Sequence, residues 1–229
     1  MKPTKTLFVT AALILGAMGA QAADFVQNGN YLTVQLKQHQ NYGPSQIRLQ
    51  VVSDRIIRVQ ATAEQGFRSK QSLIIVPQNS KAQYKVEEQG DDLIITTAAM
   101  RAVLNEATGQ ITFYDLKDQV LLKEVAQGGK TFKPFTVPDR EIGVDIAKVP
   151  EAQKHGWSWR ALFDSPDNEA FYGLGQHQSE ELNMKGKNED LFQYNTKVSV
   201  PFVISNKNYG ILWDSYSYSR WGNPDDYLQ

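Results

Sequence analysis

The feature that most constrains the fold is a series of short runs in which apolar and polar residues alternate, each ended by turn-forming residues. Turn signals recur about every dozen residues, and the runs between them are rich in Val, Ile, Thr and aromatic residues. Beyond the first residues, no window keeps the apolar period of about 3.6 that a helix requires. The pattern therefore predicts an all-β protein, an antiparallel β-sandwich or barrel without βαβ units. The expected strands are residues 30–37, 46–52, 56–61, 72–76, 84–88, 92–97, 99–105, 110–115, 120–125, 142–146, 157–163, 172–175, 191–195, 198–204 and 209–213.

One long hairpin is expected from residues 46–52 and 56–61, because Ser53-Asp54 interrupts the alternation between them. The side chains expected to face inward from its first strand are Ile47, Leu49 and Val51. The side chains expected on its solvated face are Arg48, Arg55 and Arg58.

The N-terminus has the pattern of a secretory signal peptide. Lys2 and Lys5 precede an apolar run over residues 7–18, and Ala20-Gln21-Ala22 has the small-x-small pattern of a cleavage site. The run is too short to span a bilayer, and the chain has no cysteine that could carry a lipid or form a disulfide. We therefore expect cleavage after Ala22, a periplasmic or secreted location, and no membrane anchor.

The charge balance is close to neutral. Removing residues 1–22 takes away Lys2 and Lys5 and no acid, so the formal charge changes from −1 to −3. A chain with this balance has no basic patch of the kind that binds nucleic acid. Residues 23–229 are long enough for one β-sandwich domain with a substantial core.

The most informative stretch is Phe171–Trp213. Gly173 and Gly175 suit a strand that bends sharply or passes close to other backbone, since glycine has no Cβ. Residues 176–190 then form a polar, loop-like segment, and two apolar runs follow with a turn at residues 206–208. The expected structure is a polar loop supported by two hairpins, and ordered loops of this length are often functional.

Three sequence segments in this stretch resemble those of one protein family. They are FYGLGQHQ (171–178), LNMKGK (182–187) and QYNTKVSVPFVISNKNYGILWD (193–214). In this order they resemble the N-terminal, galactose-mutarotase-like β-sandwich of glycoside hydrolase family 31, which includes α-glucosidases and α-xylosidases. A fainter resemblance extends back to residue 45. The resemblance implies that residues 23–229 are this domain, incomplete at its C-terminal end, in a secreted enzyme.

The resemblance also implies where catalysis takes place. In this family a (β/α)8 barrel after the sandwich supplies two aspartates for a retaining mechanism, and this chain contains no such barrel. The expected partners are therefore the catalytic barrel of the same polypeptide and an oligosaccharide substrate. We expect the chain alone to be inactive. Within the resemblance, the run GLGQHQ (173–178) favours the α-xylosidase branch.

One loop is implied to border the active-site entrance, near the subsite for the leaving group. The candidate substrate-binding residues in it are His177, Gln178, Glu180 and Asn183. Amide and carboxylate groups can form hydrogen bonds with sugar hydroxyls. The alternative interpretation is that these side chains are solvated or pack against the barrel.

No catalytic or metal-binding group is expected within the chain itself. The neighbouring acids Glu180-Glu181, Glu189-Asp190 and Asp225-Asp226 are typical of solvated loops, and Asp214 is expected to end a strand. The three histidines, which are His39, His155 and His177, are too scattered for a local metal site, and no cofactor fingerprint is present.

Trp157 and Trp159 allow two interpretations. On one strand they share a face, which favours a place in the sandwich core, although the same spacing could form a platform for sugar stacking. The alternative function is thus a free-standing secreted carbohydrate-binding sandwich that uses Trp157, Trp159 or Trp221. A mutarotase-type epimerase would need a histidine pair and an acid facing one cavity, which the sequence does not indicate.

Overall fold

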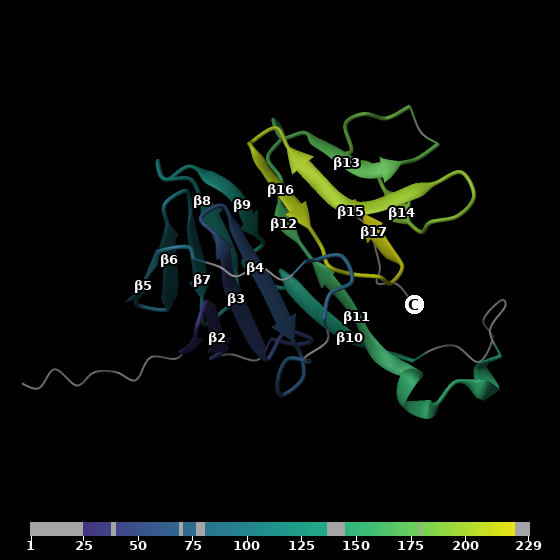
Figure 1. The fold of residues 1–229 in the computed structure, drawn as a ribbon, viewed down its shortest axis with the longest axis horizontal. Coiled ribbons are helices and arrows are strands. Elements are labelled where there is room, and N and C mark those ends of the chain that lie inside the picture. Colours follow the sequence, from purple (N-terminus) through teal and green to yellow (C-terminus); the bar gives the residue numbers. More distant parts are fainter. Residues whose placement is uncertain are drawn as a thin grey trace, which may run out of the picture.

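The computed structural model describes residues 25–37, 40–68, 71–76, 81–136, 145–178 and 180–222. The expected signal peptide, His39, residues 142–144 of an expected strand, Ser179 and Asp225-Asp226 lie outside these ranges. The described part is all-β apart from two short 3₁₀ helices, Ile146–Lys148 and Glu151–Gln153 (Figure 1). Within it, no helix has the length and apolarity needed to cross a membrane. The strands are β1 (Phe25–Asn28), β2 (Tyr31–Gln35), β3 (Gln46–Ser53), β4 (Ile56–Thr62), β5 (Tyr84–Gln89), β6 (Asp92–Thr97), β7 (Arg101–Asn105), β8 (Ile111–Tyr114), β9 (Val120–Glu124), β10 (Lys130–Thr136), β11 (His155–Ala161), β12 (Phe163–Asp164), β13 (Phe171–Gln176), β14 (Glu189–Leu191), β15 (Val198–Ser205), β16 (Tyr209–Leu212) and β17 (Ser219–Trp221).

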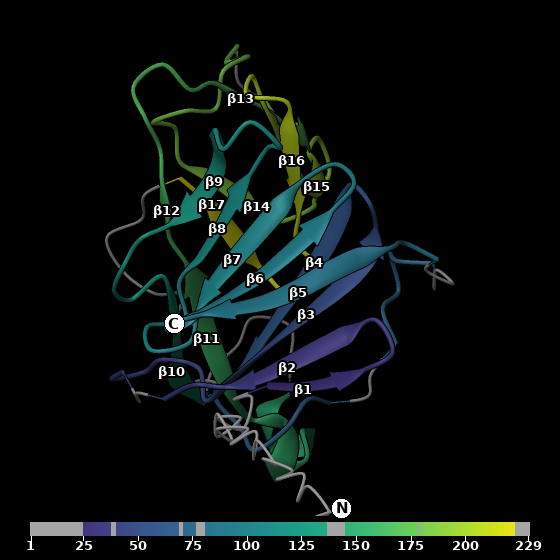
Figure 2. The same ribbon diagram turned by 90° about the vertical axis from the view of Figure 1, so that its left-hand side faces the viewer.

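Two antiparallel sheets form the main sandwich. One has the order β1-β2-β3-β4 and the other the order β12-β9-β8-β7-β6-β5, and Figure 2 shows the strands of both. Their alternating apolar side chains meet in one core, as the period of two requires. The buried members of that core are Leu32, Val34, Leu36, Ile47, Leu49, Val51, Leu93, Ile95, Leu104 and Ile111. The prediction of an antiparallel all-β fold and the inward assignment of Ile47, Leu49 and Val51 are confirmed.

The expected solvated arginine face is only partly correct. Arg55 is exposed, but Arg48 and Arg58 are half-buried. The Arg48 guanidinium lies 4.1 Å from the centre of the Phe67 ring, and Arg58 forms a 2.8 Å ion pair with Asp214. Segments distant in sequence thus cover this face of β3 and β4.

A two-stranded ribbon, β10 paired with β11, projects from the sandwich (Figure 1). The sequence did not indicate β10, because Pro134 interrupts its alternating pattern. Proline lacks an N–H, so it is tolerated where only one neighbouring strand must be bonded. Residue 146, at the end of an expected strand, instead begins a 3₁₀ helix in the connection between β10 and β11.

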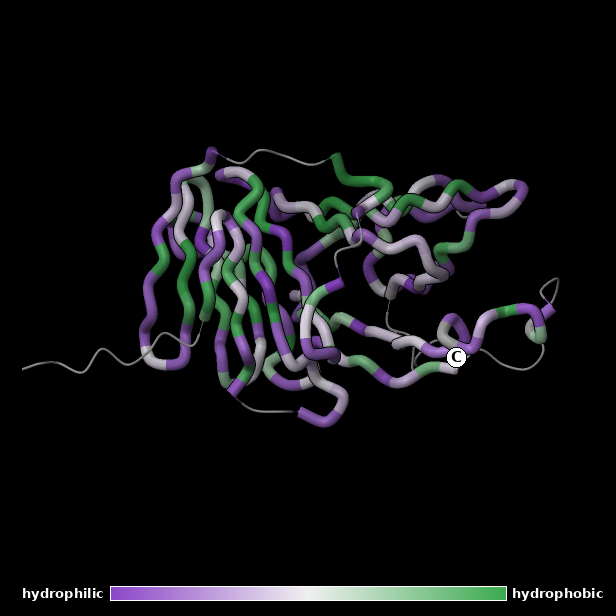
Figure 3. Tube along the Cα trace, turned by 60° about the horizontal axis from the view of Figure 1, so that its bottom comes forward, coloured by the Kyte–Doolittle hydropathy of each residue, from purple (hydrophilic) through white to green (hydrophobic). Residues whose placement is uncertain are grey.

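A smaller layer contains the sheet β13-β15-β16 and the pair β14-β17. Its own core consists of Phe171, Leu174, Met184, Leu191 and Val203, with Tyr209, Ile211, Trp213 and Trp221 packed against it. Figure 3 shows hydrophobic stretches in this layer as well as in the sandwich. The predicted hairpin of residues 198–204 and 209–213 is confirmed as β15 and β16.

The two glycines of the YGLG run allow close backbone approach, as predicted. A Cβ on Gly173 would lie 2.6 Å from the carbonyl oxygen of Phe202, and one on Gly175 would lie 1.9 Å from that of Val198. The pairing of β13 with β15 shifts register between these glycines. Both have positive φ values, 133° and 96°, so the bulge depends on glycine.

Two expected strands differ from the structure. Residues 72–76 form no strand, because the Ser72 hydroxyl accepts hydrogen bonds from the N–H groups of Ile74 and Ile75 and the Leu73 N–H donates to Tyr216. Side chains thus take the bonds that a sheet ladder would use. The expected strand over residues 191–195 is reduced to β14, which ends at Leu191.

Candidate functional site

The polar loop between β13 and β14 is anchored at Met184. This side chain is 4% exposed and lies in the core of the smaller layer. Its N–H donates to the carbonyl of Phe171 at 2.8 Å, and its carbonyl accepts from the Trp221 indole at 3.1 Å. The loop is therefore held in place at its centre, with polar residues on either side of the anchor.

Two of the four predicted site residues brace this loop. The side chain of His177 is only 4% exposed, its Nε2 donates to the Leu174 carbonyl at 2.8 Å, and its Nδ1 lies 2.9 Å from Glu189 Oε1 without the alignment of a hydrogen bond. Asn183 Oδ1 accepts from the N–H groups of Phe171 and Lys185, both at 3.0 Å. These contacts fix the backbone on either side of Met184.

The other two predicted site residues, Gln178 and Glu180, are exposed. They lie on either side of position 179, directly after His177 in the chain. The structure thus divides the four candidates into two that hold the loop and two whose amide and carboxylate face solvent.

The sheet of the smaller layer also has an exposed apolar face, which we call the β15 face. Strand side chains alternate, so Val203 and Ser205 point into the small core while their neighbours point outward. Tyr172 pairs with Ile204 and Phe202 with Leu212, which places these side chains on the same outer face. Its members, each between 37% and 49% exposed, are Tyr172, Val198, Val200, Phe202, Ile204 and Leu212. Contiguous apolar surfaces of this kind mark contacts with other protein or with ligands.

The core interpretation of the tryptophan pair is wrong. Trp157 and Trp159 are 41% and 48% exposed, because no described layer covers that face of the β10–β11 ribbon. Trp221, in contrast, stacks on Trp213 in the small core, with ring centres 6.1 Å apart. The sequence pattern could not distinguish these cases, since it records only which residues share a face.

Four acids of the loop and its surroundings are held in ion pairs, whereas Glu180 is exposed. Asp214 follows β16, as predicted, and bonds to Arg58 and the Ser72 hydroxyl. The further pairs are Glu181–Lys187, Glu189–Lys197 and Asp190–Arg220. Among the described residues, no group of three or more His, Asp or Glu side chains could hold a metal ion.

Sequence reasoning missed three buried carboxylates, Glu106, Glu124 and Glu169, and the last two depend on the following tertiary partners. Glu124 contacts the Lys130 ammonium and accepts from the Ile111 N–H at 2.8 Å. Glu169 accepts from the hydroxyls of Ser205 and Tyr209, both at 2.6 Å. Burial, together with the Glu169 carboxylate, raises the pKa of Tyr209. Glu124 and Glu169 are buried and bond to neighbouring strands, so we assign them to stability.

Comparison with known proteins agrees with this arrangement. Residues 46–221 match the family described as the glycosyl hydrolase 31 N-terminal galactose mutarotase-like domain. An uncharacterized family 31 glucosidase from Pseudescherichia vulneris is 27% identical over 178 residues, which is 74% of this chain and 32% of that protein. An alpha-xylosidase from Saccharolobus solfataricus is 25% identical over 185 residues, 76% of this chain and 23% of that protein.

A solved structure shows the same fold. The GH31 alpha-xylosidase of Xanthomonas citri superposes with a TM-score of 0.72 at 36% identity, and the match covers 90% of this chain and 20% of that one. The chain thus spans between a fifth and a third of the length of the relatives it matches. The family match and the shared fold together show that this chain belongs to glycosyl hydrolase family 31 and contains its N-terminal galactose mutarotase-like domain.

Proposed function

We propose that this chain is the non-catalytic N-terminal domain of a secreted retaining glycosidase that cleaves α-xylosidic or α-glucosidic bonds. The observation that carries the proposal is the family match over residues 46–221, supported by 36% identity to an alpha-xylosidase. In the described part of the chain, Asp214, Glu181 and Glu189 near the loop are ion-paired, so they do not form a free acid–base pair. The α-xylosidic substrate is favoured over the α-glucosidic one by the named relatives.

The β15 face is proposed to pack on the catalytic barrel that the family resemblance implies. Its six large apolar side chains lie on one face of the three neighbouring strands β13, β15 and β16, without a covering layer in the described residues. Burying such side chains stabilises an interface by about 25 cal/mol per Å² of apolar surface. The opposite side of the same sheet is already covered by its own small core, so the β15 face is the side left for such a contact.

The loop of residues 177–188 is proposed to lie at the active-site entrance. Its brace, made by His177, Met184 and Asn183, holds the outer residues Gln178 and Glu180 in a defined place. These two side chains would form hydrogen bonds with hydroxyl groups of the oligosaccharide. Because they are charged or polar and solvated in the isolated domain, they can exchange water for sugar hydroxyls at small cost.

The test compares this chain with the longer polypeptide that includes a barrel, using aryl α-xyloside and aryl α-glucoside as substrates. We expect turnover only from the longer polypeptide, and measurable turnover by the purified 229-residue chain would refute the proposal. In the longer polypeptide, Gln178→Ala and Glu180→Ala should raise KM more than they lower kcat. The control is Glu87→Gln, an exposed acid on β5, which should change neither.

The proposed location outside the cytoplasm has its own test. N-terminal sequencing of the mature protein should begin at Ala23, after removal of residues 1–22. A mature protein that retains Met1 would show that the secretion proposal is wrong.

A further inference from the structure

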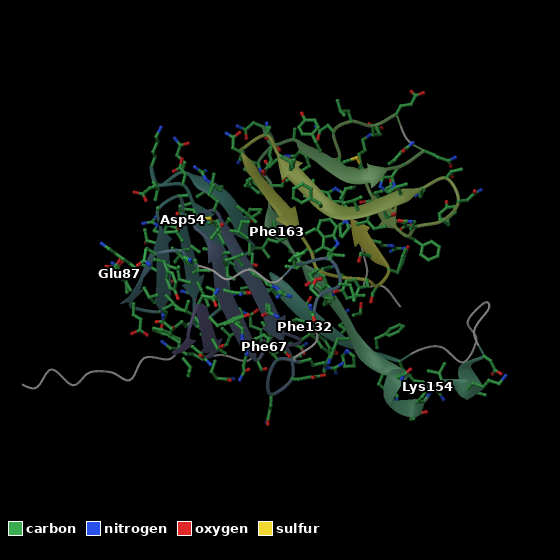
Figure 4. The ribbon with its side chains drawn as sticks, in the orientation of Figure 1. Asp54, Phe67, Glu87, Phe132, Lys154 and Phe163 are labelled. Atoms are coloured by element: carbon green, nitrogen blue, oxygen red, sulfur yellow. The ribbon has the colours of Figure 1, made fainter. Side chains whose placement is uncertain are left out.

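One face of the β10–β11 ribbon presents an aromatic surface that the proposed function does not use. Opposite residues of an antiparallel pair share a face, and Phe132 pairs with Trp159 while Pro134 pairs with Trp157. We call these four side chains the indole platform. Figure 4 labels Phe132 on β10 and Lys154 just before β11, which marks the ribbon along which the platform lies.

The platform is continuous with the interior at one end and polar at the other. The next pair toward the sandwich is Lys130 with Ala161, and the Lys130 side chain is only 10% exposed. The next pair outward is Thr136 with His155, whose Oγ1 and Nδ1 lie 3.2 Å apart. The two indoles thus lie between a buried end and an exposed end with hydrogen-bonding groups.

Trp157 is oriented through the edge of its ring. Its Nε1 donates to Glu64 Oε1 at 3.2 Å, and Arg68 holds the same carboxylate through two donors, at 2.6 and 3.3 Å. The hydrogen bonds from Arg68 and Trp157 lower the pKa of Glu64, so the carboxylate stays charged at neutral pH. The indole is therefore fixed in position while 41% of the residue remains exposed.

The platform differs in chemistry from the β15 face. The β15 face is mostly aliphatic, which suits a protein surface of complementary shape. The platform consists of aromatic rings and a proline, bordered by Glu64, Arg68 and His155. The electron-rich face of an aromatic ring attracts C–H groups that carry partial positive charge, and bordering polar groups can bond hydroxyls. A ligand with one apolar face and a polar edge matches this surface.

We propose that the indole platform binds a neutral oligosaccharide made of pyranose rings with equatorial hydroxyl groups, as in gluco- and xylo-configured chains. Such rings expose C–H groups on their flat faces and hydroxyls around their edges. Trp157 and Trp159 lie two residues apart on one strand, which separates their Cα atoms by about 6.8 Å. Each indole would therefore accept its own sugar ring. The platform shares no residue with the loop assigned to the active-site entrance.

The test is a titration of the 229-residue chain with xylohexaose and cellohexaose, followed by tryptophan fluorescence and calorimetry. Trp213 and Trp221 lie in the small core, and the Trp221 indole bonds to the loop at Met184, so the part of a saturable change that is lost in Trp157→Ala and Trp159→Ala reports on the platform. For a shallow, exposed platform we expect a dissociation constant on the order of 1 mM. An oligosaccharide of galactose should bind more weakly, because its axial hydroxyl disrupts the apolar face.

Substitutions of the two tryptophans test whether binding depends on stacking of sugar rings on the indoles. Trp157→Ala and Trp159→Ala should each weaken binding by about tenfold, whereas Trp159→Phe should retain most of it. Tyr194→Ala is the matched control, since Tyr194 is a 51% exposed aromatic residue outside the platform. Unchanged melting curves would confirm that each variant folds.

Three results would overturn the proposal. The first is no saturable signal at sugar concentrations of about 10 mM, which is well above the expected constant. The second is binding that survives the double variant of Trp157 and Trp159. The third is self-association of the chain that the same double variant abolishes, because the platform would then be a protein contact. None of these results bears on turnover by the longer polypeptide, so the two proposals fail separately.

Discussion

The ion pair between Glu124 and Lys130 offers the sharpest test of how this domain is held together. It joins the end of β9 to the start of β10, with side chains only 5% and 10% exposed. Glu124 also accepts the Ile111 N–H, and Lys130 donates to the Gly109 carbonyl at 3.1 Å. In Lys130→Met the carboxylate keeps one backbone donor and loses its counter-charge.

We expect Lys130→Met to lower the free energy of unfolding by about 3–5 kcal/mol, the cost of leaving a buried charge unpaired. For a domain of this size the melting temperature should fall by roughly 6–20 °C. The assay is urea unfolding followed by tryptophan fluorescence, with thermal melting by circular dichroism. The double variant Glu124→Gln, Lys130→Met should recover more than half of the loss, because it removes the unpaired charge.

The stability of Lys130→Met should also depend on pH, in a direction set by the pKa of Glu124. Burial raises the pKa of Glu124, and the opposing charge of Lys130 limits that shift. A carboxyl whose folded-state pKa is raised adds stability below its unfolded pKa and loses it as pH rises through the folded pKa. Without Lys130 the variant should therefore gain stability as pH falls from 7 toward about 5. A loss under about 1 kcal/mol, or a double variant no more stable than Lys130→Met, would refute this reasoning.

Two further predictions concern the smaller layer. Burial and the Glu169 carboxylate raise the pKa of Tyr209. The Tyr209 hydroxyl therefore contributes to the free energy of unfolding at pH values below its ordinary pKa of 10.0, and this contribution is lost as pH rises above that value. The difference in unfolding free energy between the protein and Tyr209→Phe should thus shrink between pH values of about 9 and 11, and a constant difference would contradict the assignment. Gly175→Ala should cost at least about 3 kcal/mol, because its Cβ would lie 1.9 Å from the Val198 carbonyl oxygen at a φ of +96°. Gly186→Ala, at a φ of +70° with no atom within 4 Å, should cost about 1 kcal/mol, and equal losses by urea unfolding would contradict the close-approach explanation.

The candidate site shows where sequence reasoning succeeded and where it did not. The YGLG run predicted a bend or a close approach, and the bulge of β13 on β15 confirms this, because only glycine fits there. The loop after it was expected to carry four candidate substrate-binding residues, His177, Gln178, Glu180 and Asn183. The structure separates them, since His177 turns inward to the Leu174 carbonyl and Asn183 bonds its own loop backbone.

The sequence by itself determined most strands of the sandwich, though not β1, because the period of two along β2, β3 and β6 is a local property of the chain. It also determined the β15–β16 hairpin, whose turn residues are adjacent in sequence. Tertiary structure decided whether an apolar face is covered. Trp221 and Trp159 both lie in β-strands, yet one packs in a core and the other is half-exposed. The physical reason is that burial depends on which distant layer meets a face, and a local pattern contains no information about that layer.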